Sequence, residues 1–414
     1  MISLVILLFF VGFLFKSFNR AVITIAIWMP VFCSVVGWKD WLLFPILSWI
    51  ALGIMIYRIC RSKIRLKDFP LRRSFIFGSI TYIFSILICK EFLVMRTGLL
   101  VGAIIFPFLS WYAIYQDKKL WKTIFINLGI ITLILTICGI IEVILGVNVI
   151  GLYLEDIGFL SVEEVREDYV RFGMNRCRSI TAWCSTYGVI CTVILTTYLL
   201  LVYYGKYKGA EKYVIYALCL ILLIGIITSG TRSVYVTFII ASIPFLLLTL
   251  IKPKYVLGLC VILFLIYSNY TDLFNEIYDS FVNHEDVQGS SINLRQNQFN
   301  IAYNKFSESP IWGHGYWAIN ELKAKKTGLM GAESIIFTLI VDRGILGIIS
   351  FFFFYWEIVK FLRKQGNFIL AFIPIAFMCG KIMSAFINID TTYILFYVFV
   401  LNQAANEYKL NRNH

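Results

Sequence analysis

Residues 293–347 read NLRQNQFNIAYNKFSESPIWGHGYWAINELKAKKTGLMGAESIIFTLIVDRGILG. The stretch begins in a polar segment and passes through a Pro-Ile-Trp-Gly-His-Gly turn at 310–315. It then enters a long apolar run at Glu333-Ser334, and that run includes a G-x-x-G. An apolar run of this length predicts a membrane helix. We therefore interpret the rest of the chain as a scaffold that holds this stretch at a membrane surface.

The composition of the whole chain favours a polytopic membrane protein. Of 414 residues, 60% are hydrophobic and 15% are charged, and the mean hydropathy is +0.81. Soluble domains are about half apolar and about a quarter charged. The net charge of +13 fits basic residues in short loops, which set membrane topology. Nucleic acid is not an expected partner, because no basic soluble domain with interleaved aromatic residues is present.

Apolar runs recur along the chain at lengths that can cross a bilayer. They predict an all-α integral membrane protein with about 12–14 transmembrane helices. The runs are 2–15, 21–38, 41–57, 74–89, 97–115, 124–146, 185–204, 213–229, 234–251, 255–268, 333–357, 368–386 and 388–402. The first run lacks a basic flank and a cleavage site, so it is interpreted as a helix. We expect a single polytopic membrane domain over residues 1–414.

The distribution of Lys and Arg predicts which connections face the cytoplasm. The loop 58–73 is the most basic and is assigned to the inside. Alternation from there assigns further basic segments to the same side: 116–119, 205–212, 252–254, 360–366 and 409–414. The two long connections, 147–184 and 269–332, are then extracytoplasmic. Loops of this length between helices are usually functional.

The ten cysteines lie mostly inside apolar runs, where a thiol behaves as a small hydrophobic group. Cys177 and Cys184 are exceptions because they lie near the first long loop, and a disulfide between them is one alternative. No Cys/His spacing indicates a metal site. A D-x-D pair, a P-loop and a G-x-S-x-G elbow are all missing from the sequence, so nucleotide-sugar and ATP chemistry are not expected.

Motifs in three parts of the chain together resemble signatures of the bacterial O-antigen polymerase and O-antigen ligase family. The Arg295-bearing segment, the P-x-x-G-x-G turn at 310–315, the polar pair Glu333-Ser334 and the G-x-x-G match the carboxy-terminal signature. Upstream, the segment from Arg178 to Gly188 resembles the second signature, with Ser-Thr where the family has Pro-Asn. The resemblance covers roughly residues 120–350.

The third signature is similar to the Ser-Gly-Thr-Arg turn that ends at Arg232. Glu333-Ser334 stands where ligases carry His-Asn, which favours the polymerase branch. The resemblance implies a glycosyltransferase C-like fold and a metal-independent polymerase without a cofactor. It also implies an undecaprenyl-diphosphate-linked glycan donor and a lipid-linked repeat unit as acceptor, used on the outer face of the bacterial plasma membrane. A chain-length regulator and a flippase are further expected partners.

Four arginines are candidates for binding the carrier diphosphate: Arg178, Arg232, Arg295 and Arg176. The planar guanidinium matches phosphate oxygens in pairs. Arg232 lies between two apolar runs, where an ionised side chain is costly unless it is paired or hydrated. The alternatives are solvated Glu–Arg pairs for the loop arginines and snorkelling at the interface for Arg232. We assign Arg232 to catalysis and the other three to substrate binding.

Glu333 is the candidate general base for the acceptor hydroxyl, with helix capping as the alternative. His314 is assigned to substrate binding and is a second candidate acid or base, with a plain turn residue as the alternative. Glu142 lies inside an apolar run and is also assigned to substrate binding, while Lys381 and Asp390 are further polar candidates. Two other functions stay open. One is a ligase that moves finished glycan to a lipid A core, and the other is a polysaccharide flippase.

Overall fold

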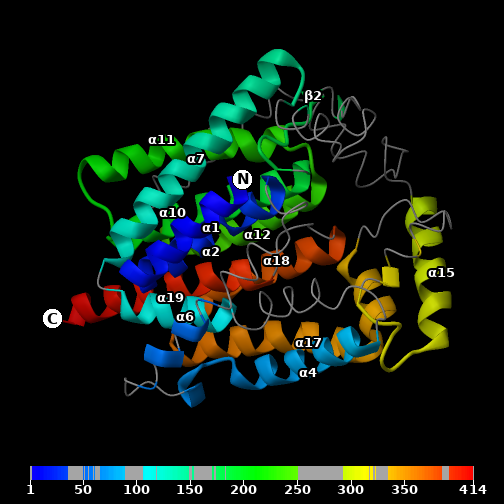
Figure 1. Ribbon diagram of the computed structural model, residues 1–414. Coiled ribbons are helices and arrows are strands. Elements are labelled where there is room, and N and C mark those ends of the chain that lie inside the picture. Colours follow the sequence, from blue (N-terminus) through cyan, green and yellow to red (C-terminus); the bar gives the residue numbers. More distant parts are fainter. Residues whose placement is uncertain are drawn as a thin grey trace.

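The computed structural model in Figure 1 describes most of the chain. The residues described are 2–35, 50, 52–54, 56–58, 60, 66–88, 106–117, 119–148, 152, 170–171, 174–181, 183–249, 292–316, 318–319, 322, 334–384 and 391–413.

Helices make up nearly all of the described structure. They are α1 (Ile2–Lys16), α2 (Phe18–Val35), α4 (Arg72–Ile88), α6 (Phe106–Gln116), α7 (Leu120–Leu145), α10 (Cys184–Tyr203), α11 (Ala210–Thr228), α12 (Arg232–Thr249), α15 (Ile292–Glu308), α17 (Ile335–Lys364), α18 (Phe372–Met383) and α19 (Thr391–Asn413), with 3-10 turns η1 (Leu66–Asp68) and η3 (Phe368–Ala371). A two-residue antiparallel ladder joins β1 (Val170–Arg171) to β2 (Met174–Asn175). The predicted all-α fold is confirmed.

Within the described residues, five helices are long and apolar enough to cross a membrane: α7, α10, α11, α12 and α17. This agrees with the predicted multi-pass membrane protein. The count of about 12–14 helices stays a prediction, because the run at 255–268 lies outside the described residues and those at 41–57 and 97–115 are described only in part. The side of the membrane assigned to each loop also stays a prediction.

Helix α10 is the centre of the bundle. Its membrane-length window is 83% buried, against 28% for α7 and 33% for α11. A helix surrounded by others needs partners for its hydroxyl groups, because no water reaches them. Thr192 and Thr196 meet this need within the helix: their hydroxyls donate to Gly188 O and Thr192 O at 2.9 and 2.8 Å.

Glycines bring α10 close to α11 and to the turn that follows it. A Cβ at Gly225 would lie 2.7 Å from the Tyr187 hydroxyl, and one at Gly188 would lie 2.7 Å from Ser229 Oγ. Small residues permit such close helix contacts within a bilayer. The result is a tightly packed end of the bundle at which α10 begins and α11 ends.

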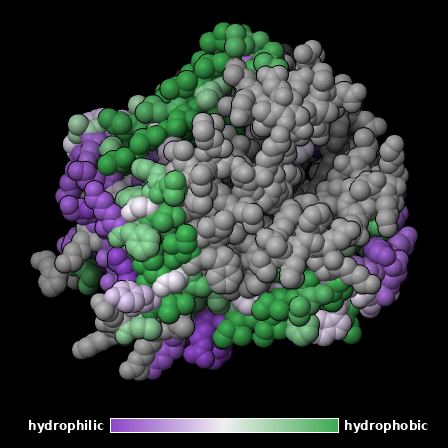
Figure 2. Space-filling model, in the orientation of Figure 1, coloured by the Kyte–Doolittle hydropathy of each residue, from purple (hydrophilic) through white to green (hydrophobic). Residues whose placement is uncertain are grey.

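The surface divides by chemistry along the bundle. In Figure 2, hydrophobic atoms cover α7 and α4, as lipid-facing surfaces should. Hydrophilic atoms gather on the left, where Figure 1 has the connection between α10 and α11 and the carboxy-terminal end of α19. One end of the bundle is therefore rich in polar and basic groups.

Candidate functional site

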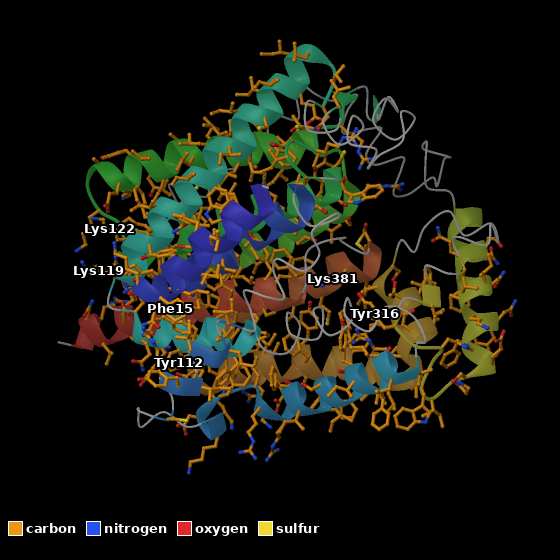
Figure 3. All side chains as sticks on the ribbon, in the orientation of Figure 1. Phe15, Tyr112, Lys119, Lys122, Tyr316 and Lys381 are labelled. Atoms are coloured by element: carbon orange, nitrogen blue, oxygen red, sulfur yellow. The ribbon has the colours of Figure 1, made fainter. Side chains whose placement is uncertain are left out.

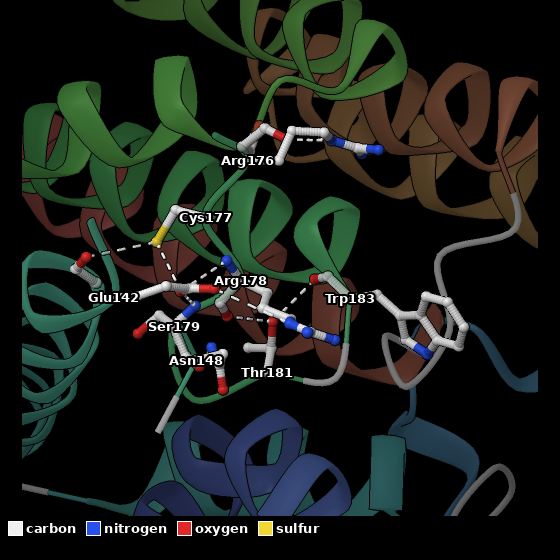
Figure 4. A network of polar contacts seen from close by, with 10 residues as sticks. Glu142, Asn148, Arg176, Cys177, Arg178, Ser179, Thr181 and Trp183 are labelled. Carbon is white, nitrogen blue, oxygen red and sulfur yellow. Dashed lines mark hydrogen bonds and ion pairs between the residues drawn. The ribbon is translucent and has the colours of Figure 1, made fainter. Parts of the chain in front are cut away.

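A carboxylate on α7 organises the loop that leads into α10. Glu142 Oε2 accepts hydrogen bonds from the backbone N–H groups of Ser179 and Arg178, at 2.7 and 3.0 Å, and from Cys177 Sγ at 3.1 Å (Figure 4). Its other oxygen lies 3.9 Å from Arg178 Nε, and both side chains are 10% exposed. Hydrogen bonds to an ionised acceptor are the stronger kind. Glu142 thus anchors the backbone on either side of Arg178.

The turn after Arg178 has an unusual backbone conformation. Ser179 has φ 53°, a region that residues other than glycine seldom occupy. Its hydroxyl donates to Leu135 O at 2.6 Å, and its carbonyl accepts from Asn148 Nδ2 at 2.7 Å. Together with the bond to Glu142, these contacts hold the strained residue in place. The direction in which Arg178 leaves the backbone is therefore set by α7.

Arg176 ties the same loop to the turn between α11 and α12. Its Nε donates to Ser229 O at 3.1 Å, and its Nη2 donates to Thr231 Oγ1 at 2.8 Å. Next to it, Cys177 N donates to Thr228 O at 2.8 Å. Arg232 follows Thr231 directly and is the first residue of α12.

Three of the four predicted arginines therefore come from two segments that touch, although about 55 positions of chain separate Arg176 from Thr231. In Figure 4 the side chains of Arg176 and Arg178 extend in the same direction from the loop. We call Arg176, Arg178 and Arg232 the arginine cluster. It brings three basic residues to one end of the bundle, where the Glu142 carboxylate lies beside Arg178.

Gly230 makes the contact of Arg176 with this turn possible. It has φ +58°, and a Cβ there would lie 2.8 Å from Arg176 Cγ. Glycine adopts a positive φ at little cost. In the folded chain, the Ser-Gly-Thr-Arg motif therefore binds the side chain of Arg176. The spacing of the motif in the sequence does not reveal this contact.

The two cysteines near this loop are free thiols. The disulfide considered from the sequence is therefore not formed in this structure, and Cys177 and Cys184 are both buried. Burial raises the pKa of the Cys177 thiol, and the neighbouring Glu142 charge raises that pKa further. Cys177 therefore stays protonated and can donate to Glu142.

A second polar assembly forms around a break in α17. Gly344 has φ 60° and ψ −152°, so the helix is interrupted there. The 310–315 turn fills the break: His314 N donates to Val341 O at 2.8 Å, Gly315 N donates to Asp342 O at 3.0 Å, and Ile345 N donates to Pro310 O at 2.8 Å. The turn satisfies backbone groups that the break frees, which is how an interrupted helix is tolerated in a membrane protein.

His314 faces α15 from within this turn. Its Nε2 lies 2.6 Å from Lys305 O and 3.9 Å from Glu308 Oε2. Glu308 also pairs with the Lys305 ammonium, and that hydrogen bond lowers the pKa of the Glu308 carboxyl. The ring of His314 thus holds the turn against the carboxy-terminal end of α15.

The apolar residues of α15 predict which face of the helix is buried, and the structure shows what that face contacts. Ala302 is fully buried in a small core with Ile340 and Val341 of α17, and Phe306 packs against that core. Phe299 keeps 49% of its surface exposed. The helix therefore packs on α17 through part of the expected face.

Asp342 is a polar residue that the sequence analysis missed. It is 3% exposed, and its Oδ1 accepts from Ile319 N at 3.0 Å. Next to it, the Arg343 guanidinium lies 4.3 Å from the centre of the Tyr82 ring, a cation–π contact. The sequence did contain a signal for this site: Asp342 is an ionisable residue inside an apolar run, two positions before Gly344.

The structure describes some of the remaining predicted residues and not others. Glu333 and Asp390 lie outside the described residues, and for Arg295 only the helical backbone of α15 is described. Ser334 is the residue that caps α17, because its Oγ accepts from Ile336 N at 3.3 Å. Lys381 is buried on α18 (Figure 3).

Comparison with known families finds one match inside the chain. Residues 217–352 match a family model described as O-antigen ligase. The matched region includes α12, the 310–315 turn and the break in α17, and it begins after the segment that holds Arg176 and Arg178. No curated protein matches the chain significantly.

Proposed function

The chain belongs to the O-antigen ligase and polymerase family of glycan-processing membrane enzymes, and from this premise we propose that it is a glycosyltransferase that polymerises lipid-linked repeat units. The donor is an undecaprenyl-diphosphate-linked glycan, and the acceptor is a second lipid-linked repeat unit. The reaction takes place at the extracytoplasmic face of the bacterial inner membrane. The product is a surface polysaccharide such as O-antigen, capsule or exopolysaccharide.

The arginine cluster is the observation that carries this proposal. Glycosyl transfer breaks the bond between the anomeric carbon and the carrier diphosphate, and the diphosphate leaves with the electron pair. Fixed positive charges near a low-dielectric surface stabilise such a leaving group. Arg176 is held by a hydrogen bond of its side chain, and Arg178 is held by a hydrogen bond of its backbone N–H. Little reorganisation of these residues is therefore needed when the negative charge develops.

The acceptor half of the reaction needs a base. The acceptor hydroxyl oxygen forms the new bond to the anomeric carbon, and its proton passes to the base. We assign this proton to Glu333, which immediately precedes the cap of α17. Arg295, on α15, is a further residue that binds the diphosphate of the donor substrate. Glu142 and His314 act as positioning residues, because Glu142 holds the loop at Ser179 and His314 contacts helix α15.

Ligation is the second candidate, because the matching family model is described by that activity. A ligase would transfer the finished glycan to a lipid A core. Glu333-Ser334 in place of a His-Asn pair favours polymerisation.

The two activities can be separated with the purified full chain. Lipid-linked repeat units alone should yield a ladder of longer glycans that remain on the diphosphate carrier. A product that appears only when lipid A core is added would contradict polymerisation and support ligation. An Arg232→Ala variant with normal melting behaviour serves as the inactive control.

A further inference from the structure

A cavity of about 570 Å³ lies at the end of the bundle remote from the arginine cluster. Tyr203 and Tyr204 line it at the end of α10, and Leu248 lines it at the end of α12. Both helices begin beside the arginine cluster, at Cys184 and Arg232. With 20 residues, α10 spans about 30 Å, which is the thickness of a hydrocarbon core. The cavity and the proposed active site therefore lie at opposite membrane faces.

The rim of this cavity is positively charged. Lys409 and Arg412, in the last turns of α19, both line it and are both exposed. Lys409 Nζ donates to Gly366 O at 2.8 Å and to Gln365 O at 3.2 Å, and an ammonium has three donors. None of the ten lining residues is acidic. The nearby Glu407 pairs with the Lys206 ammonium, which offsets its charge.

The walls are aromatic and apolar. The rings of Tyr203, Tyr204 and Tyr408 form a cluster with centroids 5.4–5.9 Å apart. Arg412 Cζ lies 5.7 Å from the centre of the Tyr408 ring. The side chains of Leu248, Ile369 and Ala405 add apolar surface to the lining, which also includes Gly366 and Asn367. A ligand that fills this cavity needs an anionic end and an apolar body.

We propose that the cavity binds an anionic phospholipid, with the phosphate headgroup at Lys409 and Arg412 and an acyl chain along Leu248 and Ile369. Tyrosines are enriched at headgroup level, and basic pockets between membrane helices on the cytoplasmic side bind anionic headgroups. A free phosphate ion would use the two cations only and would leave the apolar walls in contact with water.

The test compares lipids on the purified full chain in neutral detergent, with native mass spectrometry to measure binding. Phosphatidylglycerol should bind several-fold more tightly than phosphatidylcholine. A basic residue near an anionic lipid surface contributes a factor of about five in affinity. The Lys409→Gln/Arg412→Gln variant should therefore weaken phosphatidylglycerol binding by about 5- to 25-fold.

The matched control is Arg72→Gln/Arg73→Gln, which removes two exposed charges from the start of α4, and neither residue lines the cavity. It should bind phosphatidylglycerol within about twofold of the unmodified chain, because neither residue contacts the headgroup site and salt screens more distant charges. If Lys409→Gln disturbs folding, Arg412→Gln alone should still weaken binding.

Three results would overturn the proposal. The first is equal binding of phosphatidylcholine, and the second is equal loss in the control variant. The third is displacement of phosphatidylglycerol by millimolar inorganic phosphate, which would assign the cations to a free anion.

Discussion

At the scale of single residues, Glu142 and Arg178 have different roles. Glu142, the charge inside an apolar run, is structural, and Arg178 in the following loop is the candidate ligand. Glu142 is satisfied by two backbone N–H groups and a thiol, so its contacts are those of a structural anchor. Arg178 is held at its backbone by that anchor, its Nε lies 3.9 Å from the Glu142 carboxylate, and its side chain extends in the same direction as that of Arg176 (Figure 4).

We therefore predict that Glu142→Ala lowers stability as well as activity. The substitution leaves the N–H groups of Arg178 and Ser179 without their acceptor, at a cost of about 1–3 kcal/mol for each buried group. Thermal unfolding in detergent measures the loss. The control is Glu211→Ala at the exposed start of α11, which should cost less than about 1 kcal/mol. Normal stability with lost activity would instead make Glu142 a substrate ligand.

Arg232 is predicted to need its guanidinium and not only its charge. Removal of one donor to a developing anion typically lowers the rate by about 10²–10³-fold, and this is the fall expected for Arg232→Ala in the polymerisation assay. Arg232→Lys should fall between that variant and the unmodified chain, because an ammonium cannot make paired hydrogen bonds. Normal-length polymer from both Arg232→Ala and Arg178→Ala would refute the assignment.

Glu333 and Ser334 can be separated by adjacent substitutions. Glu333→Gln removes a base but keeps the shape, so polymerisation should fall by about 10²–10⁴-fold with an unchanged melting temperature. Ser334→Ala removes the cap of α17, so stability should fall by about 0.5–2 kcal/mol while most activity remains. A Gln variant within about threefold of the unmodified chain, below the general-base range, would move the base elsewhere.

At the scale of elements, the break in α17 and the 310–315 turn form one unit. Gly344 occupies a backbone region open almost only to glycine. A Cβ there would also lie 2.6 Å from the carbonyl oxygens of Pro310 and Ile311. The contact between the turn and the break therefore requires that residue 344 is a glycine, without a Cβ.

Gly344→Ala should thus destabilise the protein by more than about 2 kcal/mol, since a residue other than glycine in this backbone region costs about 1–3 kcal/mol and the contact adds to it. The matched control is Gly12→Ala in α1, where a Cβ meets nothing within 4 Å. That change should be neutral or slightly stabilising, because alanine favours helices. Melting curves of the two variants provide the comparison, and equal curves would show that the turn adapts.

At the scale of the whole molecule, topology connects the proposed active site with the lipid cavity. We predict that a membrane-impermeant maleimide labels Ser290→Cys in intact cells, in a background that lacks the exposed Cys60. Ser62→Cys, in the basic 58–73 loop, should react only after permeabilisation, because basic loops face the cytoplasm. The reverse pattern would invert the membrane orientation and remove the basis for an extracytoplasmic reaction.

The sequence by itself determined the class of the molecule and most helix boundaries. The runs predicted at 124–146 and 185–204 correspond to α7 and α10, with ends displaced by a few residues. They could be predicted because the length of an apolar run is a local property of the sequence, and the thickness of the bilayer sets the length that a membrane helix needs. The family resemblance also came from the sequence, since its motifs are short and contiguous.

Only the tertiary structure decided which polar groups meet. The contact of Arg176 with Thr231, the capture of the 178–179 backbone by Glu142 and the insertion of the 310–315 turn into α17 all join positions that are distant in the chain. A charge in an apolar run signals only that a partner is required. Which partner it finds depends on how helices pack, and packing is a property of the assembled bundle.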